Sequence, residues 1–206
     1  MIGIIDYKAG NLTSVKRALD YLSVQSAISA DPDAIAQCER IIFPGVGNAA
    51  SAMATLRERG LDKALISAFS MGVPILGICL GAQIILSRSE EGNTECLGLI
   101  DGECRKLKLR DPRLKIPHMG WNEIRIEKSH YILKDAAPNS HVYFVHSYFP
   151  LPKDKGMVFA SVEYGEVFPC AIGYKNLFAT QFHLEKSGPV GLAMLKNFST
   201  WDGQSC

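Results

Sequence analysis

The chain has 206 residues, of which 47% are hydrophobic and 21% are charged, so it can bury one sizeable core like an ordinary globular protein. Lysine and arginine number 22 against 21 for aspartate and glutamate. This near balance excludes the large excess of basic residues that is typical of proteins that bind nucleic acid or anionic membrane surfaces. The first residues lack a signal-peptide pattern, and the longest apolar run, 72–86, is shorter than the ~20 residues that span a bilayer. We therefore expect a single domain over residues 1–206, in the cytoplasm.

The N-terminal part of the chain alternates apolar runs with helical stripes. The runs predict strands at 2–7, 25–29, 40–43 and 73–78. Helices are predicted over 12–22, with Asn11 or Thr13 as cap, after Asp31, from about 49 to 60, over 61–69, and again just after Cys79. This alternation predicts strand–helix units built on a parallel sheet.

The C-terminal part has a different sequence pattern, with short runs of strand-forming residues separated by turns. Strands are predicted at 102–107, 121–126, 141–148, 157–164, 169–174 and 178–182. A helix that begins near Pro189 ends the chain. We expect this part to be antiparallel, and no linker or internal repeat interrupts the sequence.

Cys79 follows a continuous apolar run and lies between Gly77 and Gly81, which is the spacing of a Gly-x-nucleophile-x-Gly elbow. The glycines allow a sharp turn at a crowded point, and the N–H groups that begin the next helix favour a thiolate. The alternative is a buried structural cysteine, which is the more common role. The other cysteines form no Cys-x-x-Cys pair and predict neither a zinc site nor a disulfide framework; they are residues 38, 96, 104, 170 and 206.

A cysteine nucleophile needs a base, and His183 has a carboxylate, Glu185, two residues later. In an extended segment these two side chains project to the same face, where the carboxylate can hold the imidazole. His183 and Cys79 both follow predicted buried strands, and the carboxyl ends of parallel strands meet at one edge of a sheet. The alternative is a strand-end histidine beside a surface glutamate.

The loop after the third predicted strand contains Gly45, Val46 and Gly47. The two glycines can let the Val46 peptide rotate and aim its N–H at a developing oxyanion, for which the Leu80 N–H is the second donor. A plain tight turn is the alternative. The glycine spacing also fits a dinucleotide fingerprint, but the acidic residue expected ~20 positions on is missing, so we expect no nucleotide here.

Gln83 comes about one helical turn after Cys79 and can face the same pocket, where it would bind the amino-acid end of a substrate. A glutamine on the helix surface is the alternative.

The segments Gly-Ile-Cys-Leu-Gly-Ala-Gln, 77–83, and Gln-Phe-His-Leu-Glu-Lys-Ser, 181–187, resemble the class I, triad-type glutamine amidotransferases. Within that family, the segments 6–11, 43–47, 117–122 and 143–148 are similar to the glutaminase subunits of imidazole glycerol phosphate synthases, so the resemblance spans essentially the whole chain. Leu184 stands where the family usually has proline, and Ala82 where it commonly has methionine. Without the proline we expect the geometry of His183 and Glu185 to be looser.

The resemblance implies a flavodoxin-like α/β fold, in which a mostly parallel sheet is flanked by helices and extended by antiparallel strands. It implies that Cys79, His183 and Glu185 hydrolyse L-glutamine to glutamate and ammonia through a thioester, with no metal or organic cofactor. The ammonia would pass to a cyclase subunit with a (β/α)8 barrel, bound as a heterodimer, for histidine biosynthesis. The same resemblance implies pocket-lining roles for His146, Ser147 and Tyr148, and partner contacts for Asn11, Pro117, His118, Met119, Trp121 and Lys186.

Two other functions fit the same residues. The chain can serve as a glutaminase for another synthase, such as one that modifies a sugar. It can also be an interaction subunit that has lost turnover through Leu184. Trp121 has a structural alternative as well, since a tryptophan commonly lies in the core.

Overall fold

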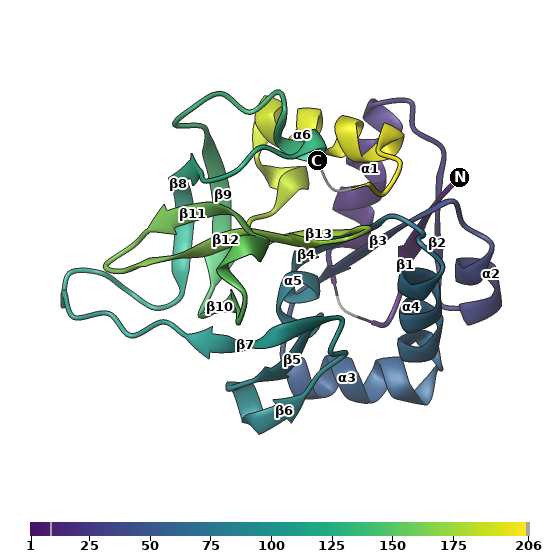
Figure 1. Ribbon diagram of the computed structural model, residues 1–206, viewed down its shortest axis with the longest axis horizontal. Helices are drawn as coiled ribbons and strands as arrows, with labels where there is room; N and C mark the ends of the chain where they lie inside the picture. The colour runs from purple at the N-terminus through teal and green to yellow at the C-terminus, as the bar shows by residue number, and fades with distance from the viewer. Residues whose placement is uncertain (9, 205–206) are drawn as a thin grey trace.

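The main sheet has nine strands, and the sheet changes from parallel to antiparallel part-way across (Figure 1). The computed structural model describes residues 1–8 and 10–204, so Cys206 lies outside it. Neighbouring strands are parallel in the first part, which runs in the order β2 (Ser26–Ser29), β1 (Ile2–Ile5), β3 (Arg40–Gly45), β4 (Ile75–Cys79) and β13 (Leu177–Thr180). They are antiparallel in the second, which continues with β12 (Val167–Tyr174), β11 (Val158–Glu163), β8 (His118–Ile126) and β9 (His141–His146). The predicted fold class is confirmed.

Helices cover both faces of the parallel strands, which is why β1 and β4 read as continuous apolar runs. On one face the buried residues of α1 (Leu12–Tyr21) and α6 (Gly188–Thr200) share a core with alternate side chains of the strands. On the other face the core is completed by α2 (Pro32–Ala36), α3 (Ala49–Glu58) and α4 (Leu61–Ser70). Two of the helix starts use side-chain caps, from Asp31 in α2 and Asn48 in α3.

A second, four-stranded sheet was not predicted. Its order is β10 (Tyr148–Pro152), β7 (Ile100–Lys106), β5 (Leu86–Ser89) and β6 (Thr94–Glu95). The predicted strand 141–148 is divided at Ser147, so that β9 belongs to the main sheet and β10 to the second one. Most strand pairs of the C-terminal part are antiparallel as expected, but β7 is parallel to β5 and β13 is parallel to β4.

The predicted helix after Cys79 is present as α5 and is short. It covers only Leu80–Ile84, and β5 begins at Leu86. A short apolar run cannot be assigned to helix or strand by its spacing alone. Here the end of the run, Leu86, is the first residue of a strand in the second sheet. Among the described residues there are also four 3₁₀ helices: η1 (Glu91–Asn93), η2 (Tyr131–Leu133), η3 (Lys155–Met157) and η4 (Leu184–Lys186).

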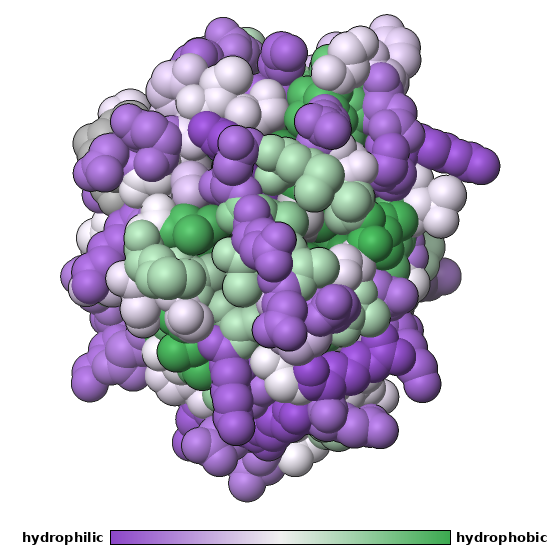
Figure 2. Space-filling view, turned by 90° about the vertical axis from the view of Figure 1, so that its right-hand side faces the viewer, coloured by the Kyte–Doolittle hydropathy of each residue, from purple (hydrophilic) through white to green (hydrophobic). Residues whose placement is uncertain are grey.

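The face on the right of Figure 1, where β2, α2 and α4 lie, has a mixed surface (Figure 2). Hydrophilic side chains run between the apolar ones across this face. Within the described residues, the helices are all too short or too polar to cross a membrane.

Candidate active site

The turn at Cys79 joins β4 to α5 and is strained. The backbone of Cys79 has φ 56° and ψ −105°, a combination that L-residues rarely adopt and that costs about 1–3 kcal/mol. The two flanking glycines serve close packing, because a Cβ on Gly81 would lie 1.9 Å from the carbonyl oxygen of Phe43, and one on Gly77 would lie 3.0 Å from the Cβ of Ala179. The predicted strand-to-helix elbow is therefore present, with its strain on the cysteine itself.

The sulfur of Cys79 lies in a nearly closed environment, since the residue is only 5% exposed. Gln181 Nε2 donates to it over 3.7 Å, and Sγ lies 4.0 Å from the carbonyl oxygen of Val145. Gln181 was not assigned a role from the sequence. It lies two residues before His183 at a predicted strand end, and the period of two that places both on one face is the signal that could have found it.

His183 Nδ1 and Glu185 Oε1 are 2.7 Å apart, and their side chains are 1% and 0% exposed. The predicted contact is present, but its predicted cause is wrong. The strand β13 ends at Thr180, and residues 184–186 form the 3₁₀ helix η4 rather than extended chain. His183 is extended, with φ −86° and ψ 107°, even though leucine replaces the usual proline after it, so this feature of the site does not need the proline.

The charge state of His183 is set by competing effects. Burial by itself lowers its pKa, but interactions with Cys79 and Glu185 reverse this and raise the pKa to about 10. The ring nitrogen Nε2 has no hydrogen-bond partner among the described residues, so we attribute the Cys79 contribution to nearby charge rather than to a formed bond. An imidazolium is therefore favoured at neutral pH.

Asn11 occupies the predicted N-cap position of α1, but its side chain lies at this carboxylate. Its backbone is left-handed, with φ 78°, and its side chain makes no capping bond to α1. Instead Nδ2 donates to Glu185 Oε1 and lies 3.5 Å from His183 Nδ1. The side chain therefore supports the orientation of the His183–Glu185 pair.

The strand β3 ends at Gly45, which is the register partner of Cys79, and the loop follows it. A Cβ on Gly45 would lie 1.8 Å from the hydroxyl oxygen of Tyr7, so close packing requires this glycine. Gly47 has φ 114° with open space around it, and its backbone conformation requires glycine. Val46, between them, is 37% exposed.

A cavity of about 260 Å³ opens beside Cys79, and its size suits a small molecule such as a single amino acid. Most of the predicted substrate-binding residues line it, whereas Gly45 does not. Pro117, predicted at the partner contact, also lines it, as do Glu91 and Val145, which the sequence did not indicate. The full lining is Val46, Gly47, Cys79, Leu80, Gln83, Glu91, Pro117, Val145, His146, Ser147 and Tyr148.

Gln83 points inward and is only 6% exposed, so it is not a helix-surface residue. Its Nε2 donates to the carbonyl oxygen of Tyr148 over 2.9 Å and to Gln181 Oε1 over 3.0 Å. The amide is thus held between β10 and the chain segment that precedes His183.

His146, which lines the cavity, forms a buried pair with His118, with 3.0 Å between His118 Nδ1 and His146 Nε2. Burial lowers the pKa of His118 to about 4 and that of His146 to about 3, so both are neutral at pH 7. His118 is 2% exposed and stacks on Tyr164, with ring centroids 4.0 Å apart. The expectation that His118 contacts a partner is corrected, because the pleat of β8 turns this side chain into the core.

The neighbouring residues of β8 point outward instead. Met119 is 62% exposed and Trp121 is 56% exposed. The Trp121 ring lies 6.1 Å from that of Tyr143, and Lys186 Nζ lies 5.7 Å from the Tyr143 ring. These four residues, here called the β8–β9 face, adjoin the active site, since Tyr143 pairs through its backbone with His183.

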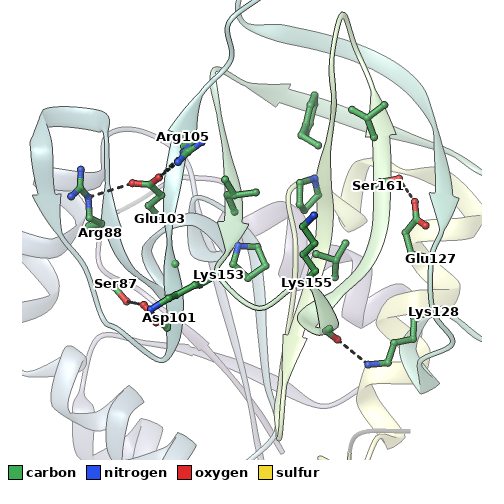
Figure 3. A pocket seen from close by; sticks show the side chains of 18 residues that line it. Ser87, Arg88, Asp101, Glu103, Arg105, Glu127, Lys128, Lys153, Lys155 and Ser161 are labelled. Carbon is green, nitrogen blue, oxygen red and sulfur yellow. Dashed lines mark hydrogen bonds and ion pairs between the residues drawn. The ribbon is translucent and has the colours of Figure 1, made fainter.

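A larger cavity, of about 910 Å³, is a groove between the second sheet and strands β11 and β12, and it contains none of the residues around Cys79 (Figure 3). Its charged side chains mostly meet partners on its own rim. Lys153 pairs with Asp101 at 3.3 Å, and Arg88 with Glu103 at 3.6 Å. Size alone therefore does not identify the reactive site here. Within residues 1–8 and 10–204, no group of three or more His, Cys, Asp or Glu side chains is placed to hold a metal ion.

Similarity to known proteins agrees with this geometry. Residues 3–200 match the family model described as glutamine amidotransferase class-I. The chain is 48% identical over 204 residues to the imidazole glycerol phosphate synthase subunit HisH of Nitratidesulfovibrio vulgaris, covering 96% of this chain and 95% of that protein. It is 43% identical over 209 residues to the subunit of the same name from Neisseria meningitidis, covering 96% and 98%.

Among solved structures, that of PurLQS from Thermotoga maritima has a similar fold, with a TM-score of 0.73, 17% identity and 96% coverage of each chain. At that identity the likeness concerns the fold alone. The family match and the full-length relatives lead to one conclusion: the chain belongs to the class-I glutamine amidotransferase family.

Proposed function

We propose that this protein is the glutaminase subunit of an imidazole glycerol phosphate synthase, which hydrolyses L-glutamine to glutamate and delivers ammonia to a cyclase subunit. The observation that carries the proposal is the buried arrangement of Cys79, His183 and Glu185 beside an amino-acid-sized cavity. Relatives that cover nearly the whole chain and bear this name support the choice of synthase.

In the reaction, Cys79 acts as the nucleophile and His183 carries the proton. The thiolate attacks the amide carbon of glutamine, the C–N bond breaks, and the His183 imidazolium gives its proton to the leaving nitrogen, which departs as ammonia. Water then attacks the thioester, His183 takes a proton from it, and the C–S bond breaks to release glutamate. Glu185 and Asn11 hold the imidazole in orientation throughout.

Charge develops on the amide oxygen in both steps. We assign its stabilisation to the backbone N–H of Leu80, directly after the nucleophile, and to the peptide of Val46 in the loop beside it. No atom lies within 4 Å of the position that a Cβ on Gly47 would occupy, so this side of the loop is unobstructed. Gln83, His146, Ser147 and Tyr148 line the remainder of the glutamine site.

The β8–β9 face is our proposed docking surface for a cyclase with a (β/α)8 barrel, in a heterodimer. Two of its residues, Met119 and Trp121, are large apolar side chains more than half exposed, which is typical of interface anchors. Pro117 both lines the cavity and is exposed, so it lies where ammonia would leave. The proposal includes a cytoplasmic location, and its support is the relatives' role as synthase subunits.

The test is steady-state glutamine hydrolysis by the subunit alone, with the cyclase, and with the cyclase plus an unreactive acceptor analogue. If the loop lacks one oxyanion donor at rest, the free subunit should be slower by about 10²–10³-fold, and each addition should raise the rate. Three equal rates would exclude gating by the partner, and failure to bind a cyclase would exclude this synthase.

Trp121→Ala should weaken cyclase binding and ammonia transfer. Tyr21→Ala is the matched control, because it also truncates an exposed aromatic side chain, 78% exposed on α1. Normal binding and transfer by the Trp121 variant would remove this residue from the interface.

A further inference from the structure

The carbonyl oxygen of Tyr148 accepts two side-chain hydrogen bonds on the wall of the cavity. His146 Nδ1 lies 2.8 Å from it, and Gln83 Nε2 lies 2.9 Å from it. A carbonyl oxygen can only accept, so both partners must be donors. This one atom therefore fixes the tautomer of His146 and the orientation of the Gln83 amide.

The direction of donation continues from Gln83 to the nucleophile. The second N–H of Gln83 Nε2 donates to Gln181 Oε1 over 3.0 Å, which leaves Gln181 Nε2 as the donor to Cys79 Sγ over 3.7 Å. Both donors of Gln83 are thereby used. Its oxygen is the group left to meet a ligand in the cavity, and an acceptor there suits the ammonium group of an amino acid.

On the other side of the Tyr148 carbonyl, donation runs toward this carbonyl through the histidine pair. With its proton on Nδ1, neutral His146 has Nε2 as an acceptor, and His118 Nδ1 donates to it over 3.0 Å. His118 Nε2 is then the acceptor for Asn122 Nδ2, 3.3 Å away. The chain of bonds thus begins on β8, the strand that carries Met119 and Trp121.

Asn122 is oriented independently of the histidines. Its Nδ2 donates to the carbonyl oxygen of Glu163 over 3.0 Å, and its Oδ1 accepts from the N–H of Glu123 over 2.8 Å. The two ends of the chain, Asn122 and Tyr148, therefore require the same tautomers of His118 and His146. Protonation of either ring would turn its accepting nitrogen into a donor, which would then face the N–H group that donates to it.

We propose that His118 and His146 are positioning residues for glutamine hydrolysis. His146, held by His118, anchors the Tyr148 carbonyl, and that carbonyl holds Gln83 and, through it, Gln181 in the orientation that directs a donor at Cys79 and an acceptor at the substrate. The proposal rests on the proposed function and adds a physical link between β8 and the nucleophile. Neither histidine touches the reacting atoms in this role, since both act through the Tyr148 carbonyl and the two glutamines.

The experiment compares His146→Leu with His146→Asn, in complex with the cyclase. Leucine removes the donor to the Tyr148 carbonyl, whereas the asparagine amide nitrogen can replace Nδ1. We expect the leucine variant to raise KM for glutamine about tenfold with a smaller change in kcat, and the asparagine variant to recover most of that loss. His118→Leu, one bond further away, should raise KM about threefold, and His118→Asn should restore it.

The rate at which iodoacetamide alkylates Cys79 is a second measurement. It reports whether Gln181 still donates to the sulfur, and it requires no turnover. This rate should change in His146→Leu and return toward the wild-type value in His146→Asn. His130→Leu is the matched control, because His130 is also buried, at 3% exposed, but accepts from the Ile132 N–H and shares no hydrogen bond with this network. It should lower thermal stability and leave KM and alkylation unchanged.

Wild-type KM and alkylation rate in His146→Leu would overturn the proposal. Equal defects in the leucine and asparagine variants would overturn it too, since the histidine would then act only by packing. If the wild-type complex does not hydrolyse glutamine, the proposed function is wrong, and the alkylation rates still decide whether the histidines position Cys79.

Discussion

The active site contains two histidine environments that are similarly buried but shift the histidine pKa in opposite directions. His183 is 1% exposed, and His118 and His146 are 2% and 5% exposed. Yet the pKa of His183 is raised to about 10, whereas burial lowers the pKa of His118 to about 4 and that of His146 to about 3.

The difference lies in the neighbours of each ring. His183 meets the carboxylate of Glu185 and the thiol of Cys79, which can carry negative charge. His118 and His146 meet each other, a backbone carbonyl, an amide and aromatic rings, and His146 is also affected by the charge of His183. Burial disfavours the charged form at all three, so an anionic partner is what makes one histidine a proton carrier.

The largest expected effect comes from Cys79→Ala, which removes one of the two groups that raise the pKa of His183. Glutamine hydrolysis should fall by about 10³-fold or more, and the pKa of His183 should move down toward those of the buried pair. Ammonia release and an NMR titration of His183 measure the two effects. Cys38→Ala, the same change at another buried cysteine, should leave both unaltered. Retained thioester formation in the Cys79 variant would contradict its assignment.

Glu185→Gln keeps the shape of the side chain and removes its charge. We expect hydrolysis to fall by about 10²-fold, less than in His183→Ala, because an orienting residue contributes less than the base that it holds. The pKa of His183 should also fall. An active variant with an unchanged His183 titration would show that the carboxylate is not the orienting group.

The two environments should give opposite pH dependences of folding stability. His183 has a folded pKa of about 10, above its ordinary 6.5, so its contribution is full below pH 6.5 and is lost as the pH rises toward 10. For His118 and His146 the folded pKa lies below 6.5, so their contribution is full above pH 6.5 and is lost as the pH falls toward 3–4.

Urea unfolding at a series of pH values measures both slopes. Glu185→Gln should flatten the alkaline slope, and His146→Asn should flatten part of the acid slope. If the same variant flattened both slopes equally, the two environments would not be independent.

Leu184→Pro should have the smallest effect on activity. Leu184 is the first residue of η4, a position where proline is tolerated, and His183 already has the extended backbone that a following proline requires. Turnover should stay within about threefold of wild type. Since Leu184 is fully buried, the loss of side-chain volume should lower the free energy of unfolding by about 1–2 kcal/mol. A large loss of turnover with normal folding would show that the N–H of Leu184 matters for the site.

The sequence by itself determined the parallel half of the sheet and the three catalytic candidates. Continuous apolar runs such as that of β4 indicate strands covered on both faces, and the ends of such strands share an edge. Cys79 and His183 follow two of these runs, so local patterns were sufficient to bring them together. The family's motifs at the same residues pointed to the reaction.

Only the tertiary structure decided where the polar side chains around the triad point. Asn11 donates to Glu185, Gln181 donates to Cys79, and His118 turns inward while Trp121, on the same strand, turns outward. Each of these contacts joins segments distant in sequence or depends on the strand register, and a side chain such as asparagine or histidine suits the surface, a cap or the core equally well. Its role is fixed by the donor or acceptor that the fold brings to it, and no local pattern records that partner.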